Sequence, residues 1–427
     1  MLHYSHVKPD LLVYNREPMN SDFTPVSVVI PVYRNLAATQ RCIEAVLGSE
    51  LGPGTRVIII DDDSPEPEIS SWCQQQDTRK AVTVLRNDEN LGFVATVNRG
   101  IEASGDTDVV LLNSDTEVAN NWLERLQNCA YSGAAIGTVT PLSNNASVCS
   151  YPAPLKENAL PEGWPLQALD ALVARVNQGK SVELPTAVGF CMYIRRACLD
   201  AVGVFDEENF GIGYGEECDF SMRAKSAGWL NLLSADVFVY HEGGQSFTSQ
   251  TKDRICAAEE TLRRLHPQYH VLATRFIDED PIRVFRDTID LARIAQSPQD
   301  SKSIIIGLQS YRDTLLGSKT NRELSLEHAF GEVTSERNSL SEKFEEAVVK
   351  SVSVEADLVA SRGELSARTE RLESTSNELT LAQKELLRLQ QDLLRVQLRD
   401  RRWRYLMYFV NRLDAVRLCV SQARKPQ

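Results

Sequence analysis

The chain has 427 residues, of which 42% are hydrophobic and 25% are charged, and its formal net charge is −13. This length suits two or three domains, and the composition is that of an ordinary globular protein. Because nucleic-acid binders need basic surface to neutralise phosphates, the acidic balance excludes nucleic acid as a partner of the whole chain.

The cysteines and the apolar segments indicate where the protein works. Nine cysteines are scattered at positions 42, 73, 129, 149, 191, 198, 218, 256 and 419. They form no CxxC pair or cysteine–histidine cluster typical of zinc sites, which predicts buried thiols in a reducing compartment. The sequence shows no signal-like N-terminus and no window of about 20 apolar residues. We therefore expect a cytoplasmic protein that touches a membrane at most from its surface.

From residue 25 onward, short apolar runs alternate with helical patterns. Strands are predicted at 26–32, 56–60, 81–85 and 108–112, and helices at 35–47, 66–76 and 95–103. Strands rich in Val and Ile that alternate with helices indicate an α/β fold with a mostly parallel sheet, covered on both faces. Residues 140–185 predict an inserted loop with one helix. Regular signals return at 187–194 and 237–241, and 251–300 is predicted to be mainly helical.

Acidic residues follow two of the predicted strands, at the sheet edge where ligands of such folds bind. Asp61-Asp62-Asp63 ends the second strand, and Asn113-Ser114-Asp115 follows the fourth. The Asp115 carboxylate suits Mg²⁺ or Mn²⁺ shared with a substrate phosphate, but a cap of the helix near Ala119 explains it equally well. A carboxylate of the first group can accept a hydrogen bond from a pyrimidine base. An Asx-turn before Pro65 is the structural alternative.

Two further motifs could carry chemistry. Glu216-Glu217 follows a glycine-rich stretch, 211–215. A carboxylate there can act as the general base for a sugar hydroxyl, although acids in the first turn of a helix are also stabilised by the helix dipole. His241 ends an apolar run and precedes Glu242-Gly243-Gly244, which fits either a metal ligand or a structural histidine.

In order and spacing, these motifs resemble the family 2 glycosyltransferases of the GT-A fold, in particular the rhamnosyltransferase-like branch. The resemblance covers about residues 25–290, and its motifs lie at 28–35, 60–64, 90–100, 111–117, 215–229 and 238–241. It implies a Rossmann-like α/β domain that uses Mg²⁺ or Mn²⁺. Asp115 stands at the metal-binding position of the family's DxD-type motif, whose first Asp is Asn113 here, and His241 is the expected second ligand. Glu217 aligns with the family's catalytic Asp, and Glu216 remains its rival.

The resemblance also implies a binding site for the donor. Pro31 and Tyr33 would line the base pocket, and Asp61 or Asp62 would bind the uracil or thymine ring. The other expected nucleotide-binding residues are Asn90, Gly92, Asn98 and Asn113. Residues expected beside the acceptor or behind the base are Asp219 and Arg223.

The implied reaction is a single displacement with inversion. A sugar moves from a UDP- or dTDP-sugar to a hydroxyl of a glycan or lipid-linked acceptor, in the synthesis of bacterial surface polysaccharide. An inactive scaffold that recruits partners through a coiled coil is the alternative. A nucleotidyltransferase is disfavoured, because no glycine-rich and basic phosphate loop follows the first strand.

The C-terminal third has a different character. Leucines recur every seven residues, at Leu358, Leu365, Leu372, Leu379, Leu386 and Leu393, which predicts a coiled coil over 335–398 and self-association or a partner helix. Residues 399–427 are basic and aromatic, a pattern typical of a helix that lies on an anionic membrane or on another protein. The predicted order is an N-terminal arm (1–24), a GT-A domain (25–300), a helical linker (301–334), the coiled coil and the tail.

Overall fold

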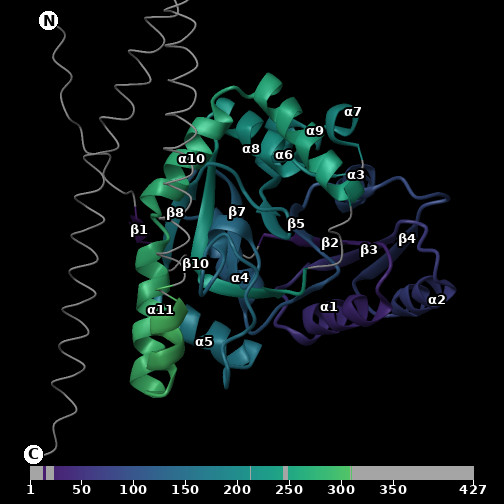
Figure 1. Ribbon diagram of the computed structural model, residues 1–427. Helices are drawn as coiled ribbons and strands as arrows, with labels where there is room; N and C mark the ends of the chain where they lie inside the picture. The colour runs from purple at the N-terminus through teal and green to yellow at the C-terminus, as the bar shows by residue number, and fades with distance from the viewer. Residues whose placement is uncertain (1–12, 16–23, 212, 244–248, 308, 310–427) are drawn as a thin grey trace, which may run out of the picture. The chain divides into compact units, whose positions relative to one another are not determined.

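The computed structural model describes residues 13–15, 24–211, 213–243, 249–307 and 309 (Figure 1). The chain divides into two compact units, Met1–Arg312 and Asp313–Gln427. The predicted coiled coil (335–398) and basic tail (399–427) lie outside the described residues, so both stay predictions.

One mixed sheet forms the centre of the first unit (Figure 1). Its strands run in the order β1-β8-β10-β7-β9-β5-β2-β3-β4, and β6 pairs with β10 off this path. Their bounds are β1 (Val13–Asn15), β2 (Val26–Val32), β3 (Arg56–Asp61), β4 (Val82–Arg86), β5 (Asp108–Leu112), β6 (Thr116–Glu117), β7 (Ile136–Ser143), β8 (Lys180–Leu184), β9 (Cys191–Ile194) and β10 (Leu230–His241).

The predicted parallel sheet is confirmed in part. Strand β2 pairs in parallel with β3 and β5, β3 pairs in parallel with β4, and β7 pairs in parallel with β10. By contrast, β9 is antiparallel to β5 and β7, and β8 is antiparallel to β10 and β1. The expectation of a mostly parallel sheet is therefore corrected to a mixed sheet.

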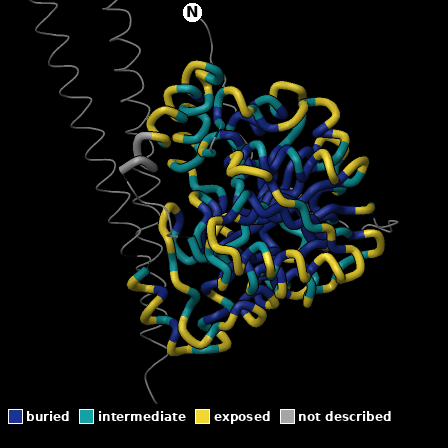
Figure 2. Tube along the Cα trace, turned by 90° about the vertical axis from the view of Figure 1, so that its right-hand side faces the viewer, coloured by how far each residue is buried: buried dark blue, intermediate teal, exposed yellow. Residues whose placement is uncertain are grey.

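Helices cover both faces of the sheet. Consecutive strand residues point to opposite faces, so apolar side chains stand on both faces and pack against these helices. On β2, for example, Val28 and Ile30 belong to one core and Val29 to the other. The first core receives side chains from α1 (Leu36–Gly48), α2 (Pro67–Gln76), α4 (Trp122–Ala130), α5 (Leu166–Val176) and α11 (Arg283–Gln296). The second receives them from α3 (Phe93–Ser104), α6 (Arg196–Val202), α7 (Glu207–Phe210), α8 (Glu216–Ser226) and α9 (Ser249–Leu265). Figure 2 shows the buried residues at the centre of this unit and the exposed ones around its rim.

Several predicted boundaries differ from the structure. Strand β7 overlaps the predicted loop at 140–185, and that region also contains β8 and the short helix η1 (Ser147–Cys149) besides the one expected helix, α5. Residues 13–15 of the predicted irregular arm form β1. The helical prediction for 251–300 is confirmed by α9, α10 (Tyr269–Glu279) and α11.

Two expectations about compartment bear on the described residues. Their cysteines form no disulfide, as predicted. Within the same part of the chain, no helix is both long enough and apolar enough to cross a membrane.

Candidate active site

The parallel strands bring the predicted acidic motifs to one edge of the sheet. In the ladder between β2 and β3, Val32 lies opposite Asp61, and β5 runs in parallel on the other side of β2. The segments that leave β3 and β5 therefore start from the same edge. Asp62 and Asp115 lie in these two segments.

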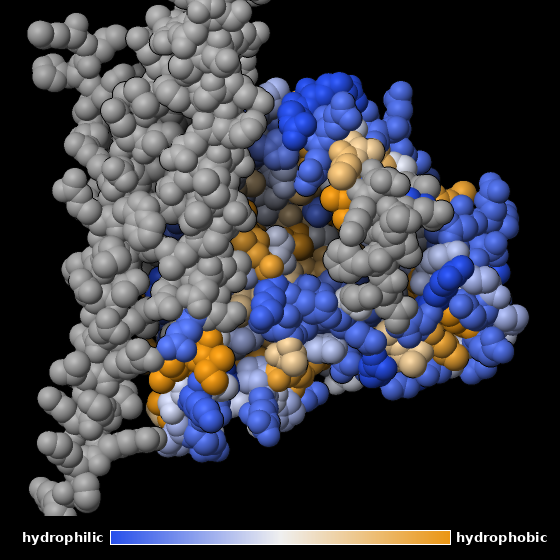
Figure 3. All heavy atoms as spheres, in the orientation of Figure 1, coloured by the Kyte–Doolittle hydropathy of each residue, from blue (hydrophilic) through white to orange (hydrophobic). Residues whose placement is uncertain are grey.

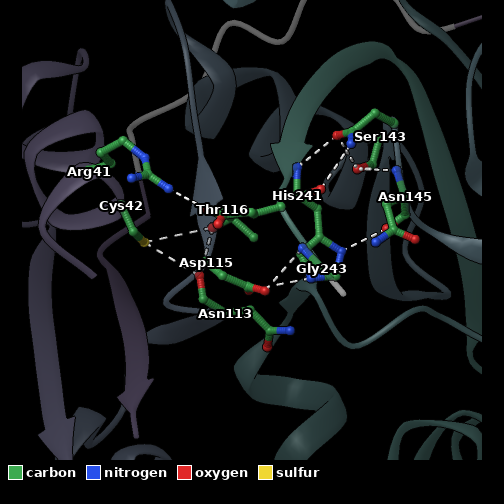
Figure 4. Close-up of polar contacts among 11 residues, drawn as sticks. Arg41, Cys42, Asn113, Asp115, Thr116, Ser143, Asn145, His241 and Gly243 are labelled. Atoms are coloured by element: carbon green, nitrogen blue, oxygen red, sulfur yellow. Dashed lines mark hydrogen bonds and ion pairs between the residues drawn. The ribbon is translucent and has the colours of Figure 1, made fainter. Parts of the chain in front are cut away.

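Asp115 faces His241 across a short ladder. Thr116 and Glu117 form β6, which pairs with the last two residues of β10. This pairing places Asp115 Oδ1 3.3 Å from His241 Nε2 (Figure 4). The main-chain N–H of Gly243 donates to Asp115 Oδ2 at 3.3 Å, and the N–H of Glu242 donates to the Asp115 carbonyl at 2.9 Å. The two residues directly after β10 thus hold Asp115 through their main-chain N–H groups.

The segment after β7 fixes the orientation of the His241 ring. The carbonyl of Asn145 lies 2.7 Å from His241 Nδ1, and because a carbonyl can only accept, Nδ1 carries the hydrogen. The side chain of Asn144 bonds both the N–H and the carbonyl of His241, at 2.8 and 2.9 Å. Phe190 stacks on the imidazole with a centroid distance of 5.3 Å. Nε2 is therefore the nitrogen directed at Asp115.

Asp115 and His241 shift each other's pKa. Burial alone would raise the pKa of Asp115, but the hydrogen bond and charge of His241 outweigh it and hold that pKa below its usual value. Burial alone would lower the pKa of His241, and the hydrogen bond and charge of Asp115 raise it above its usual value. The two groups therefore favour an ion pair in which Nε2 is protonated.

The same pair fits a divalent cation that takes few protein ligands. The ring orientation leaves Nε2 as the ligand atom once its proton is lost, with a carboxylate oxygen beside it. Among the described residues, no cluster of three or more His, Cys, Asp or Glu side chains could hold a metal. Mg²⁺ and Mn²⁺ commonly bind one or two carboxylates and complete their shells with substrate phosphates and water.

Arg41, on α1, forms two ion pairs at this edge of the sheet. Its guanidinium Nε lies 2.9 Å from Glu117 Oε1, and its Nη2 pairs with Glu242. Glu117 and Glu242 flank the Asp115–His241 ladder, so Arg41 ties both strands of that ladder to α1. About half of the Arg41 side chain is exposed, so solvent screening weakens these ion pairs.

Glu217 lies close to the chain segment that carries Phe190, whereas Glu216 is more deeply buried. A Cβ at Gly189 would lie 3.8 Å from Cβ and Cγ of Glu217, and the next residue, Phe190, stacks on His241. Glu217 is half-buried, and burial raises its pKa. Glu216 is 6% exposed, and its Oε2 has no hydrogen-bond partner among the described residues. Burial and then the charge of Glu217 raise the pKa of Glu216.

Asp219 and Arg223 hold α8 in place. Arg223 Nε donates to Asp219 Oδ2 at 2.7 Å, and its two terminal nitrogens donate to the carbonyls of Val202 and Val204. The other carboxylate oxygen of Asp219 lies 2.7 Å from Nε2 of His266, at the end of α9. These contacts account for both residues as supports of the helix that carries Glu217. The alternative expectation, a place beside the acceptor, stays a prediction.

Asp61 and Asp62 point into the protein and hold two loops. Asp62 is 4% exposed and accepts hydrogen bonds from Asn87 Nδ2 and from the N–H groups of Leu91 and Gly92, at 2.6 to 2.9 Å. Asp61 accepts from the N–H of Ser64 at 2.9 Å and pairs with Ser70 and Arg86. Both carboxylates thus support the surrounding loops, and direct contact of either one with the ring of the base stays a prediction.

The other residues predicted to bind the nucleotide lie at different places. Tyr33 and Asn90 line a hollow of about 640 Å³ together with Asp63 and Arg86, next to the half-buried Pro31. Gly92 is buried under Asp62, and the side chain of Asn113 extends to the same side of the chain as Asp115 (Figure 4). The amide of Asn98 bonds the main chain of Phe205 and the side chain of Glu207 on α7, and its predicted contact with the nucleotide stays a prediction.

The comparison with known proteins agrees with these motifs. Residues 27–203 match the family described as Glycosyl transferase family 2. The matched segment is thus similar to a family 2 glycosyltransferase domain. It spans β2 to α6 and includes Asp115, whereas Glu217 and His241 lie beyond the matched residues. The rhamnosyltransferase-like branch stays a prediction.

Three of the similar proteins show the extent of the likeness. The chain is 24% identical to the protein y4gI of Sinorhizobium fredii over 243 residues, which are 52% of this chain and 25% of that protein. It is 25% identical to the glycosyltransferase AglE of Haloferax volcanii over 225 residues, 52% of this chain and 68% of that protein. A solved structure of the mannosyltransferase PcManGT from Pyrobaculum calidifontis, in complex with GDP-Man and Mn²⁺, is 13% identical with a TM-score of 0.44. That match covers 72% of this chain and 84% of PcManGT.

Proposed function

We propose that the first unit is an inverting GT-A glycosyltransferase that moves a sugar from a UDP- or dTDP-sugar to a hydroxyl of a glycan or lipid-linked acceptor. The family 2 match supports the reaction class. One observation carries the assignment of the site, namely that the strand-end carboxylate Asp115 lies 3.3 Å from His241 Nε2. The acceptor class and a role in bacterial surface polysaccharide synthesis rest on the resemblance of the sequence alone.

Asp115 and His241 would hold Mg²⁺ or Mn²⁺. When bound, such an ion neutralises the charge that develops on the departing nucleoside diphosphate. The N–H group of Gly243 and the carbonyl of Asn145 orient the two ligands, so little rearrangement is needed for binding. This support is the kind that tunes the affinity of metal ligands in proteins.

Glu217 is proposed as the general base. The acceptor oxygen forms a bond to the anomeric carbon while the bond from that carbon to the diphosphate breaks, and the hydroxyl proton passes to the Glu217 carboxylate. Its closeness to Gly189, which precedes Phe190, supports a position on the His241 side. Glu216 is the rival, but its 6% exposure leaves little access for a substrate.

The hollow beside Tyr33 is proposed as the base side of the donor site. Tyr33 is 45% exposed, so its ring is available to stack on a base. Asp62 would act indirectly, by holding the loop of Leu91 and Gly92 at the same edge.

A nucleotide-release assay tests the proposal. The full chain is incubated with UDP-, dTDP- and GDP-sugars, with Mn²⁺ or with EDTA, and the products on lipid-linked and glycan acceptors are analysed. We expect release from a UDP- or dTDP-sugar that depends on the metal. If no donor is consumed under any condition, the proposal is wrong and the scaffold alternative is favoured.

A further inference from the structure

A second cavity lies away from the strand-end site. It has a volume of about 860 Å³ and is bordered by the segment after β7, by α5, by α11 and by the helical residues 301–307. Its walls do not include Asp115, His241 or Glu217. In Figure 3, hydrophobic side chains gather on the surface where the lower part of α11 meets α5. The volume lies within the range of small-molecule sites.

Buried hydrogen bonds hold the polar wall of this cavity rigid. Arg293 is 3% exposed, and its Nη2 lies 2.9 Å from Asp300 Oδ2. The same Asp300 oxygen accepts from Trp164 Nε1 at 2.7 Å. The hydroxyl of the buried Tyr151 bonds Asp290 at 2.8 Å and Arg293 at 3.0 Å. A ligand would therefore meet polar groups that are already ordered.

The charges around the cavity are balanced. Four basic residues line it, Arg283, Arg286, Arg293 and Lys302, and four acidic ones, Glu162, Asp287, Asp290 and Asp300. This balance favours a neutral ligand over a phosphate or a cation. Guanidinium and carboxylate groups side by side offer donors and acceptors together, which matches hydroxyl groups that both donate and accept.

Two side chains indicate which neutral ligand fits. Trp164 is half-buried in the cavity wall, its indole nitrogen is fixed by Asp300, and the guanidinium carbon of Arg293 lies 5.9 Å from its ring centroid. The part of the ring that is still exposed offers apolar surface to a ligand. The C–H face of a pyranose ring can pack on such an indole. Arg286 is 3% exposed, and its Nη1 has no hydrogen-bond partner among the described residues, so an acceptor is missing at this wall.

We propose that this cavity binds a neutral oligosaccharide, the part of a glycan acceptor that lies away from the reacting hydroxyl. The proposal rests on the proposed function for the link to transfer. One continuous segment borders both sites, because Asn144 and Asn145 hold His241, and Pro152 and Pro154 farther along line the cavity. A glycan bound in the cavity would add to the affinity for acceptors.

Binding to the full chain tests the site directly. The probes are neutral linear hexasaccharides of glucose, galactose, mannose or rhamnose, measured by calorimetry. We expect at least one to bind, and we expect Trp164→Ala to weaken binding about ten-fold, with partial recovery in Trp164→Phe. Ala168 is exposed and lines the cavity from α5, so Ala168→Phe should fill it and weaken binding similarly.

The control is Ala171→Phe, which changes an exposed alanine on the same helix that does not line the cavity. It should bind like the wild type. Failure of all four hexasaccharides to bind, or unchanged binding in Ala168→Phe, overturns the proposal. Hydrolysis of the nucleotide sugar without acceptor should be the same in Ala168→Phe and in the wild type. If the wild type consumes no donor with any acceptor, the proposed function fails while the binding result still decides the site.

Discussion

Asp115 and His241 are coupled electrostatically, and this coupling governs how a metal can bind. The proton on Nε2 and a metal compete for the same nitrogen. Because Asp115 raises the pKa of His241, the imidazolium persists to a higher pH than that of an ordinary histidine. The metal should displace the proton from Nε2 more easily as the pH rises.

We therefore expect the affinity for Mn²⁺ in the presence of UDP to rise with pH through the range just above the usual pKa of histidine, about 6.5. Calorimetry across this range measures it. His241→Gln should bind Mn²⁺ more weakly and with a flatter pH dependence. An affinity that is equal at all these pH values in the wild type would contradict a role for Nε2 as a ligand.

The two neighbouring glutamates should behave differently when each is neutralised. Glu217→Gln should lower kcat by about 10²-fold or more, the usual contribution of a general base, with little change in KM for the donor. Glu216→Gln should retain most of the activity, because Glu216 is buried without access to substrate. Initial rates with saturating donor measure both. The reverse pattern would assign the base to Glu216.

At the scale of single residues, the sequence predicts the charged side chains of the site better than the residues that hold them in place. The nearness of Asp115 and His241 could be anticipated because the family resemblance made both of them expected metal ligands. Asn145 and Phe190, which orient His241, carry no recognisable signal, since one acts through its carbonyl and the other through a ring face. Asp62 was expected to bind a base, but burial and three hydrogen bonds direct it inward.

Among the elements, α3 packs unusually close to the sheet at Gly100. A Cβ at this position would lie 2.8 Å from Ile60 Cδ1 and closer still to Val29 Cγ1, and both side chains are fully buried. Gly100→Ala should therefore lower the free energy of unfolding by about 1–3 kcal/mol. Gly48→Ala, at the end of α1, has no atom within 4 Å of the added methyl group and serves as the control.

Urea denaturation of the two variants checks this prediction. Gly48→Ala should be neutral or more stable by up to about 1 kcal/mol, because alanine favours a helix. Equal stability of Gly100→Ala and the wild type would show that α3 can move away from β2 and β3 at no cost.

The elements themselves were largely predictable where local pattern decides them. Apolar runs rich in Val and Ile locate β2, β3, β4 and β5 to within about one residue of the predicted bounds. The direction of β9 was not predictable, because its side chains alternate between the two faces of the sheet whether it runs parallel or antiparallel to β5. Strand β7 overlapped the predicted loop, since Pro141 and the polar residues after it read as irregular structure.

For the whole molecule, the heptad leucines predict self-association through residues 335–398. Leu386→Asp places a charge at a predicted core position and should lower the mass of the full chain from an oligomer to a monomer. Gln391→Asp makes the same change on the predicted outer face and should leave the oligomer intact. Size-exclusion chromatography with light scattering gives the masses. A monomeric wild type would refute the prediction.

The central claim is that Asp115 is the strand-end carboxylate on which metal-dependent transfer depends. The most direct test is metal-dependent nucleotide release by Asp115→Asn, which keeps the size of the side chain and removes its charge. Glu117→Gln, two residues along the same segment and paired with Arg41, is the matched control. We predict that Asp115→Asn releases nucleotide at least about 10²-fold more slowly than the wild type, with unchanged thermal stability. Glu117→Gln should release nucleotide at nearly the wild-type rate. Full release by Asp115→Asn in the presence of Mn²⁺ would contradict the assignment.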